Sequence, residues 1–218
     1  AYELAKSGAQ VTVLARNDRV GKKLLCTGNG KCNLTNTDAS AKAYNSAFVE
    51  NALSKYTPQE IVSRFKAMVL LVRIDAEGRV YPYCESATAV LNVFLQRLRE
   101  VGAQIVCDCE VEEIIRCGKE FKVRSSNGEY ICDCTVLATG SDATQGKNSH
   151  FLAEKLGHRT TEIKYVISPL LCKEVRGANG VRAKVSASIF INGEIAMQER
   201  GEVLFKDGAL SGVLIFRL

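Results

Sequence analysis

Residues 21–36 read GKKLLCTGNGKCNLTN. Between Cys26 and Asn33 the stretch holds two glycines, two asparagines and two cysteines. Glycine permits positive φ angles and close approach of the backbone, and an asparagine amide both donates and accepts hydrogen bonds. The stretch therefore predicts a loop that wraps its backbone around a flat or phosphate-bearing ligand, with an ordinary surface turn as the alternative. It does not match the dinucleotide fingerprint G-x-G-x-x-G, because Asn33 occupies the last position.

A helix end and a strand precede this loop. Residues 1–10 are typical of the last turns of a helix that ends at Gly8, and residues 11–15 (VTVLA) form an apolar run typical of a buried parallel strand. Helix, glycine and strand make up the second half of a βαβ unit. The first half, with its strand and glycine-rich turn, would lie before Ala1.

The end of this strand is where a dinucleotide-binding unit places an acidic residue that binds the ribose hydroxyls. Here Ala15 and Arg16 occupy the candidate positions, and Asn17 or Asp18 would have to substitute. The sequence thus departs from the simplest dinucleotide-binding pattern at this point.

Composition describes an ordinary soluble globular protein of 218 residues, with 46% hydrophobic and 24% charged residues. The net charge of +5 comes from scattered basic residues, so a nucleic-acid partner is not favoured. No apolar run approaches the roughly 20 residues of a membrane span. The nine cysteines are odd in number and follow no compact secreted framework, which predicts reduced thiols in the cytoplasm. The chain starts without methionine and stops within the apolar run 214–218, so we expect a fragment of a longer protein.

Regular elements follow the loop as far as residue 132. Thr57 before Pro58 is a good helix start, and residues 86–101 carry an apolar stripe at helical spacing before Gly102. We expect helices at 47–55, 58–68 and 86–101 and strands at 69–74, 104–107, 111–115, 120–124 and 130–132.

Residues 133–141 (DCTVLATGS) predict a buried strand that runs into Ala138, Thr139 and Gly140. Small residues there would let a ligand approach the carboxyl end of the strand, where open α/β sheets bind ligands. An ordinary turn after the strand is the alternative. A helix over 149–156 follows, closed by Gly157.

A β-rich region begins near residue 162. Strands are expected at 166–167, 183–191, 195–198 and 203–205, and Asn192-Gly193 between two of them is a strong hairpin signal. The sequence therefore predicts two domains, at 1–161 and 162–218.

Candidate metal and catalytic groups give weak signals. The Cys107/Cys109 and Cys132/Cys134 pairs lie on predicted strands, where half-buried thiols are favoured over a zinc site, so no metal site is predicted. We interpret His150 and His158 as structural and Glu85 and Glu110 as lone carboxylates, and name no catalytic acid, base or nucleophile. Lys22, Lys23 and Lys31 bracket the opening loop and would complement a pyrophosphate or an anionic substrate, with solvated surface lysines as the alternative.

The order of several stretches resembles that of a known family. The stretches are NDRVGKK (17–23), TGNGKCNLTN (27–36), GRVYP (78–82), LATG (137–140), LGH (156–158), GEVLF (201–205) and LSG (210–212). Together they resemble the bacterial NAD(P)/FAD-dependent oxidoreductase flavoproteins, an aminoacetone-oxidase-like group that includes a bile-acid dienone reductase. The resemblance spans essentially the whole chain, and the TGNGKCN loop is its most specific part.

The resemblance implies an α/β fold: a glutathione-reductase-like, FAD-binding Rossmann domain, here without its first strand, with an inserted β-rich domain. Its loop would lie against the flavin, Val111 would contact the adenine end, and residues 138–140 would pass beside the dinucleotide. The predicted cofactor-binding residues are Arg16, Asn17, Lys23, Thr27, Gly28, Asn29, Gly30, Lys31, Cys32, Asn33, Val111, Ala138, Thr139 and Gly140.

The activity implied is an FAD-dependent reduction of a small unsaturated or carbonyl-type organic substrate, with NAD(P)H as the reductant. We expect residues 1–218 alone to bind FAD weakly or not at all and to be inactive, because the phosphate-binding turn would lie upstream. A Rossmann-like module that binds a nucleotide or RNA without redox chemistry is the alternative function.

Overall fold

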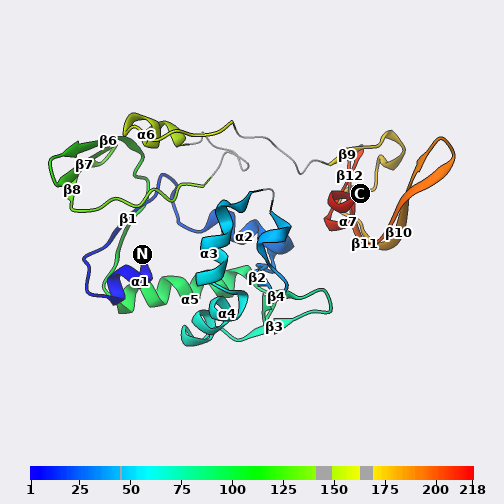
Figure 1. Ribbon diagram of the computed structural model, residues 1–218, viewed down its shortest axis with the longest axis horizontal. Helices are drawn as coiled ribbons and strands as arrows, with labels where there is room; N and C mark the ends of the chain where they lie inside the picture. The colour runs from blue at the N-terminus through cyan, green and yellow to red at the C-terminus, as the bar shows by residue number, and fades with distance from the viewer. Residues whose placement is uncertain (45, 141–148, 163–168) are drawn as a thin grey trace. The chain divides into compact units, whose positions relative to one another are not determined.

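A computed structural model describes residues 1–44, 46–140, 149–162 and 169–218. The chain divides into two units, Ala1–Arg159 and Thr160–Leu218, which are described separately (Figure 1).

A parallel pair of strands organises the first unit. Strand β1 (Thr12–Leu14) pairs with β5 (Gln104–Val106), with Val13 opposite Ile105. Each strand follows a helix and a glycine with positive φ, as the sequence predicts for βαβ units. Parallel pairing after a helical crossover confirms the α/β class. The six helices described in this unit are α1 (Tyr2–Lys6), α2 (Lys22–Cys26), α3 (Glu50–Lys55), α4 (Pro58–Ala67), α5 (Ala87–Glu100) and α6 (His150–Lys155).

Helix α5 contributes two residues to one of the hydrophobic clusters of this unit. Its apolar stripe faces the core as predicted: Val90 is fully inaccessible to solvent, and Phe94 is partly buried against the same cluster. Ala87 and Val90 pack with Leu70 and Cys32, and the side chains of Phe65 and Phe94 meet edge to face beside them. The side chain of Ser86 accepts a hydrogen bond from the backbone N–H of Ala89 and so caps the helix.

A small antiparallel sheet lies next to this core, in the strand order β2 (Thr35–Asn36), β4 (Arg79–Pro82), β3 (Val72–Ile74). Helix α4 precedes β3 and begins as predicted, because the hydroxyl oxygen of Thr57 accepts a hydrogen bond of 3.2 Å from the backbone N–H of Glu60. The strand expected at 69–74 is shorter than predicted, because Val69 has a φ of 64° in the turn that ends α4.

A three-stranded meander completes the first unit. Strands β6 (Val111–Cys117), β7 (Glu120–Ser125) and β8 (Gly128–Cys132) pair in sequence order, as predicted. Leu152 of α6 packs on Ile114 and Val123, and all three side chains are buried.

The strand predicted immediately after the meander is wrong. Residues 133–140 form no strand, and Val136 and Leu137 are 71% and 40% exposed. A strand needs a neighbouring strand to pair its backbone groups, and none of the described strands pairs with this segment.

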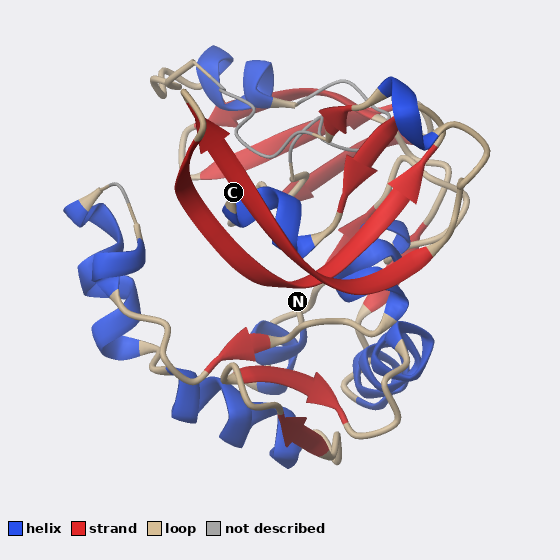
Figure 2. Ribbon diagram, turned by 90° about the vertical axis from the view of Figure 1, so that its right-hand side faces the viewer, coloured by secondary structure: helices blue, strands red, loops and turns tan. Residues whose placement is uncertain are grey.

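The second unit is an antiparallel sheet in the order β10 (Arg182–Ile191), β11 (Glu194–Lys206), β12 (Ala209–Ser211), β9 (Leu170–Leu171), with the helix α7 (Val213–Arg217). Strands β10 and β11 form one long twisted ribbon (Figure 2). Asn192 and Gly193 both have positive φ at its turn, which confirms the predicted hairpin. The strands expected at 195–198 and 203–205 are one continuous strand, and the one expected at 166–167 lies outside the described residues.

Candidate functional site

The loop from Thr27 to Asn33 is closed on itself. It begins as the 3-10 helix η1 (Thr27–Gly30). The hydroxyl of Thr27 donates a hydrogen bond of 2.7 Å to the carbonyl oxygen of Leu24. The backbone N–H of Cys32 then donates to the carbonyl oxygen of Thr27 at 3.1 Å. Gly28, Gly30 and Cys32 have φ angles of 54°, 85° and 60°. Three left-handed residues within one short loop produce a tight turn.

The two glycines of this loop have different surroundings. A Cβ atom on Gly28 would lie 2.7 Å from the backbone nitrogen of Asn33 and 3.3 Å from the ring of Tyr81. A Cβ atom on Gly30 would have no atom within 4 Å. Gly28 is thus required by packing as well as by its backbone angle, whereas the side of Gly30 faces open space. Asn29 lies between them, within η1.

Cys32 is a core residue. Only 2% of it is exposed, and it packs with Leu70, Ala87 and Val90. A buried thiol in apolar surroundings is less reactive than an exposed one. The structure therefore gives Cys32 an anchoring function within the loop.

Lys31 forms an ion pair with Glu85, with 2.8 Å between Nζ and Oε2. The second carboxylate oxygen of Glu85 pairs with Arg73. The hydrogen bond from Lys31 is the main reason that the pKa of Glu85 lies below its usual range, with the charge of Arg73 adding to it. The description of Glu85 as a lone carboxylate is therefore wrong, since the residue joins two cations that lie far from it in sequence.

Lys23 and Gly140 bring two distant predicted stretches together. The ammonium nitrogen of Lys23 lies 2.8 Å from the point where a Cβ atom on Gly140 would stand. Gly140 therefore lies beside the end of the Lys23 side chain of α2, and Ala138 and Thr139, which precede it, are exposed. Helix α2 is itself fixed to α5, because Gly21 at its start packs against the side chain of Leu91.

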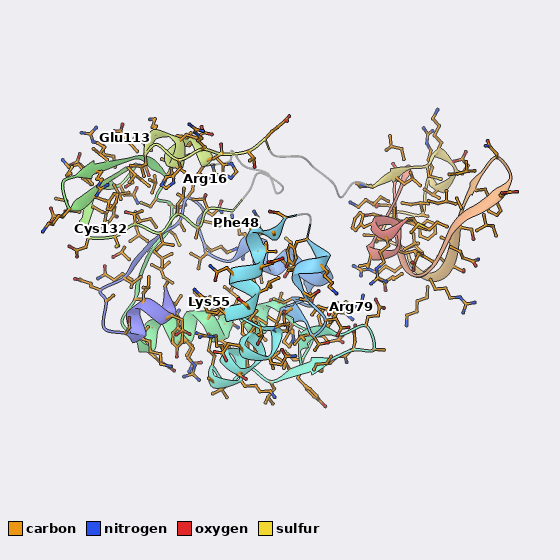
Figure 3. All side chains as sticks on the ribbon, viewed as in Figure 1. Arg16, Phe48, Lys55, Arg79, Glu113 and Cys132 are labelled. Carbon is orange, nitrogen blue, oxygen red and sulfur yellow. The ribbon has the colours of Figure 1, made fainter. Side chains whose placement is uncertain are left out.

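Arg16, Asn17 and Val111 form a second group at the carboxyl ends of β1 and β5. The carbonyl oxygen of Asn17 accepts a hydrogen bond of 3.0 Å from the backbone N–H of Asp108. Arg16 (labelled in Figure 3) lies 3.8 Å from Glu110, so Glu110 is not a lone carboxylate either, and Val111 begins β6 directly after it. Open α/β sheets bind their ligands at this end of their parallel strands.

Among the described residues, no cluster of three His, Cys, Asp or Glu side chains could hold a metal ion, and no helix is long and apolar enough to cross a membrane. A shallow hollow of about 460 Å³ contains none of the predicted cofactor-binding residues and is lined by Asn36, Asp38, Ala39, Ala43 and Tyr44.

The relatives of the chain include two bacterial enzymes. It is 27% identical over 219 residues to the 3-dehydro-bile acid delta(4,6)-reductase of Clostridium scindens, covering 96% of this chain and 53% of that protein. It is 24% identical over 230 residues to the ribosomal RNA dihydrouridine synthase of Haemophilus influenzae, covering 100% of this chain and 57% of that protein. The chain thus spans about half the length of these relatives.

Among solved structures, NikD, described as an unusual amino acid oxidase essential for nikkomycin biosynthesis, matches with a TM-score of 0.41 and 13% identity, over 72% of this chain and 50% of that one. The model of the HI0933-like protein Rossmann domain family matches residues 1–214. The family resemblance and the Rossmann fold predicted from the sequence are thereby confirmed. The chain belongs to the HI0933-like protein Rossmann domain family.

Proposed function

We propose that the protein is an FAD-dependent oxidoreductase that reduces a small unsaturated or carbonyl-type compound, with NAD(P)H as the reductant. The observation that carries this proposal is the proximity of Lys23 to Gly140. It joins, in one unit, two stretches that family resemblance assigns to the same dinucleotide. The absence of disulfides at all nine cysteines supports a reducing compartment, and we propose the cytoplasm.

The residues present suit an anionic dinucleotide. A lysine ammonium complements a pyrophosphate, and a glycine backbone beside it allows close approach because it carries no side chain. Lys23 and Gly140 would hold the dinucleotide, with Arg16 and Asn17 at its adenosine end and the Thr27–Asn33 loop at the flavin. FAD, when bound, supplies the hydride chemistry, while the protein binds and orients the reactants.

The names of the relatives suggest the substrate class. A 3-dehydro bile acid with delta(4,6) unsaturation contains a ketone conjugated to carbon–carbon double bonds. A dihydrouridine is a uridine whose ring double bond, next to a carbonyl, has been saturated. We infer that the present protein likewise adds hydrogen across a carbon–carbon double bond conjugated to a carbonyl group.

Flavin binding by the purified full-length protein is the first test. Bound FAD gives an absorbance band at about 450 nm, which NADH or NADPH should bleach and a conjugated enone should restore. A saturated ketone of the same skeleton is the control substrate and should not restore it. If the protein does not bind FAD even when FAD is added in excess, the oxidoreductase proposal is wrong. That result would favour the alternative function, a module that binds a nucleotide or RNA without redox chemistry.

A pair of lysine variants tests the site itself. Lys23→Gln should raise the Kd for FAD about tenfold, because it removes a cation beside the predicted pyrophosphate. Lys22→Gln is the matched control, since the Lys22 ammonium lies 2.6 Å from Asp18 and is held there by a separate ion pair. Equal effects of the two variants would assign the change to net charge alone.

A further inference from the structure

Glu85 has an unusual backbone conformation. Its φ is 50°, in the left-handed region that residues other than glycine seldom adopt. It follows β4 and stands directly before Ser86, the N-cap of α5. Strained backbone of this kind persists where the surrounding structure holds it, and it is a reason to look for a function.

The carboxylate of Glu85 reaches the cofactor loop from this position. It pairs with Lys31 at 2.8 Å, and its side chain is 28% exposed, less than that of Lys31 at 49%. Arg73 of β3 binds the other carboxylate oxygen and so fixes the orientation of the carboxylate. A carboxylate held from both sides loses less conformational freedom on pairing with the loop than an isolated one would.

The next residue of the loop supplies a second attachment to the same helix. Cys32, with its φ of 60°, packs on Ala87 and Val90 in the first turn of α5. The loop is thus joined to the N-terminal end of α5 twice in succession, by an ion pair at Lys31 and by a buried thiol at Cys32. Two adjacent attachments define both the position and the direction of the backbone between Gly28 and Asn33.

We propose that Glu85 is a positioning residue, which holds the Thr27–Asn33 loop through Lys31 in the closed form that receives the flavin. This inference rests on the proposed function, because it assigns the loop to the flavin end of FAD. Lys31 accordingly acts as a loop anchor whose charge Glu85 balances, and phosphate binding falls to Lys23. The competing account is a surface ion pair without consequence, as many exposed pairs are.

Four variants of the full-length protein separate the two accounts. Glu85→Gln and Lys31→Gln each remove the ion pair, and the double variant tests whether they act through each other. Glu129→Gln is the matched control, because Glu129 also pairs with two cations, Lys122 and Arg124, but lies on the meander. The measurements are the Kd for FAD, the visible circular dichroism of the bound flavin, and amide hydrogen exchange of residues 27–33.

Glu85→Gln and Lys31→Gln should each weaken FAD binding about tenfold, and the double variant should be no weaker than either single one. The two single variants should also change the visible circular dichroism of the bound flavin and speed amide hydrogen exchange in residues 27–33. Glu129→Gln should leave the Kd for FAD, the dichroism and the exchange unchanged. Identical behaviour of Glu85→Gln and Glu129→Gln, in a protein that binds FAD, overturns the positioning function alone. If the unaltered protein binds no FAD, the proposed function fails, and the exchange data decide whether Glu85 holds the loop.

Discussion

The side chain of Asp75 accepts two hydrogen bonds from Arg79 in the turn between β3 and β4. The Nε atom of Arg79 donates to one carboxylate oxygen of Asp75 at 2.7 Å, and its backbone N–H donates to the other at 3.0 Å. That second oxygen also accepts a bond of 2.9 Å from the backbone N–H of Glu77. One aspartate therefore organises the turn that leads into β4, the central strand of the small sheet.

This arrangement predicts a loss of stability in acid. Burial raises the pKa of Asp75, but the hydrogen bonds from Arg79 and Glu77 outweigh it, and the net pKa lies below its usual value. A carboxyl whose pKa is lower in the folded state stabilises the protein above its unfolded pKa, about 3.9, and the effect is lost as pH falls through the folded value.

Asp75→Asn should therefore lower the free energy of unfolding by about 1–3 kcal/mol at pH 7. The difference from the unaltered protein should shrink as the pH falls below about 4. Urea unfolding at a series of pH values measures it, with the exposed Asp133→Asn as the control. A difference that stays constant down to pH 2 would contradict the assignment of this effect to the ionised carboxylate.

Local signals predicted much of the fold. The Thr57 cap, the apolar stripe on α5 and the Asn192-Gly193 turn each act through neighbours in sequence, and the structure confirms all three. The continuity of β11 was missed, because the strands expected at 195–198 and 203–205 leave out residues 199–202, among them Gly201. In the structure Gly201 lies within the strand, and a Cβ atom on it would approach the side chain of Leu214 to 3.3 Å. Such packing depends on a distant helix and cannot be predicted from the residues around the glycine.

The candidate site was predicted as separate stretches rather than as an arrangement. The sequence indicates the loop at 27–33 and the segment at 138–140, but not the proximity of Lys23 to Gly140. It leaves Glu85 without partners, because Lys31 and Arg73 are brought to that carboxylate by the tertiary fold and not by closeness in sequence. The buried strand expected within residues 133–141, ahead of Ala138, was wrong for a related reason. Apolar composition favours a strand, but a paired neighbour is needed to form one.

The two glycines of the loop should respond differently to alanine. Gly28→Ala adds a Cβ atom 2.7 Å from backbone in a left-handed residue, and the expected loss of stability is about 2–3 kcal/mol. Gly30→Ala, the matched control, adds its Cβ atom to open space, so only the cost of a positive φ remains, about 1 kcal/mol. Thermal and urea unfolding measure both. Equal losses would mean that the contact with Asn33 relaxes without cost.

Leu152 should be a major contributor to the stability of the first unit. It is 1% exposed and joins α6 to the meander through Ile114 and Val123. Leu152→Ala should destabilise the protein by about 2–5 kcal/mol, through lost apolar burial and the cavity left behind. Ile131→Ala on β8 is the control, because Ile131 is 68% exposed and its truncation should cost less than about 0.5 kcal/mol. Similar losses at the two positions would contradict the packing of α6 on the meander.

Cys32, the buried cysteine of the loop, should react slowly with thiol reagents. Its thiol is buried among apolar side chains, whereas Cys84 is exposed. A thiol reagent should therefore label Cys84 quickly in the native protein and Cys32 only as the protein opens, as followed by mass spectrometry over time. Cys32→Ser should lower stability by about 1–3 kcal/mol, because it places a hydroxyl group in the same apolar site, and Cys84→Ser should have almost no effect. Cys32→Ala keeps an apolar side chain in this site but removes the sulfur that packs against α5, so it should still bind flavin, with a higher Kd than the unaltered protein. Rapid labelling of Cys32 in the native state would show instead that the loop opens readily and exposes a reactive thiol.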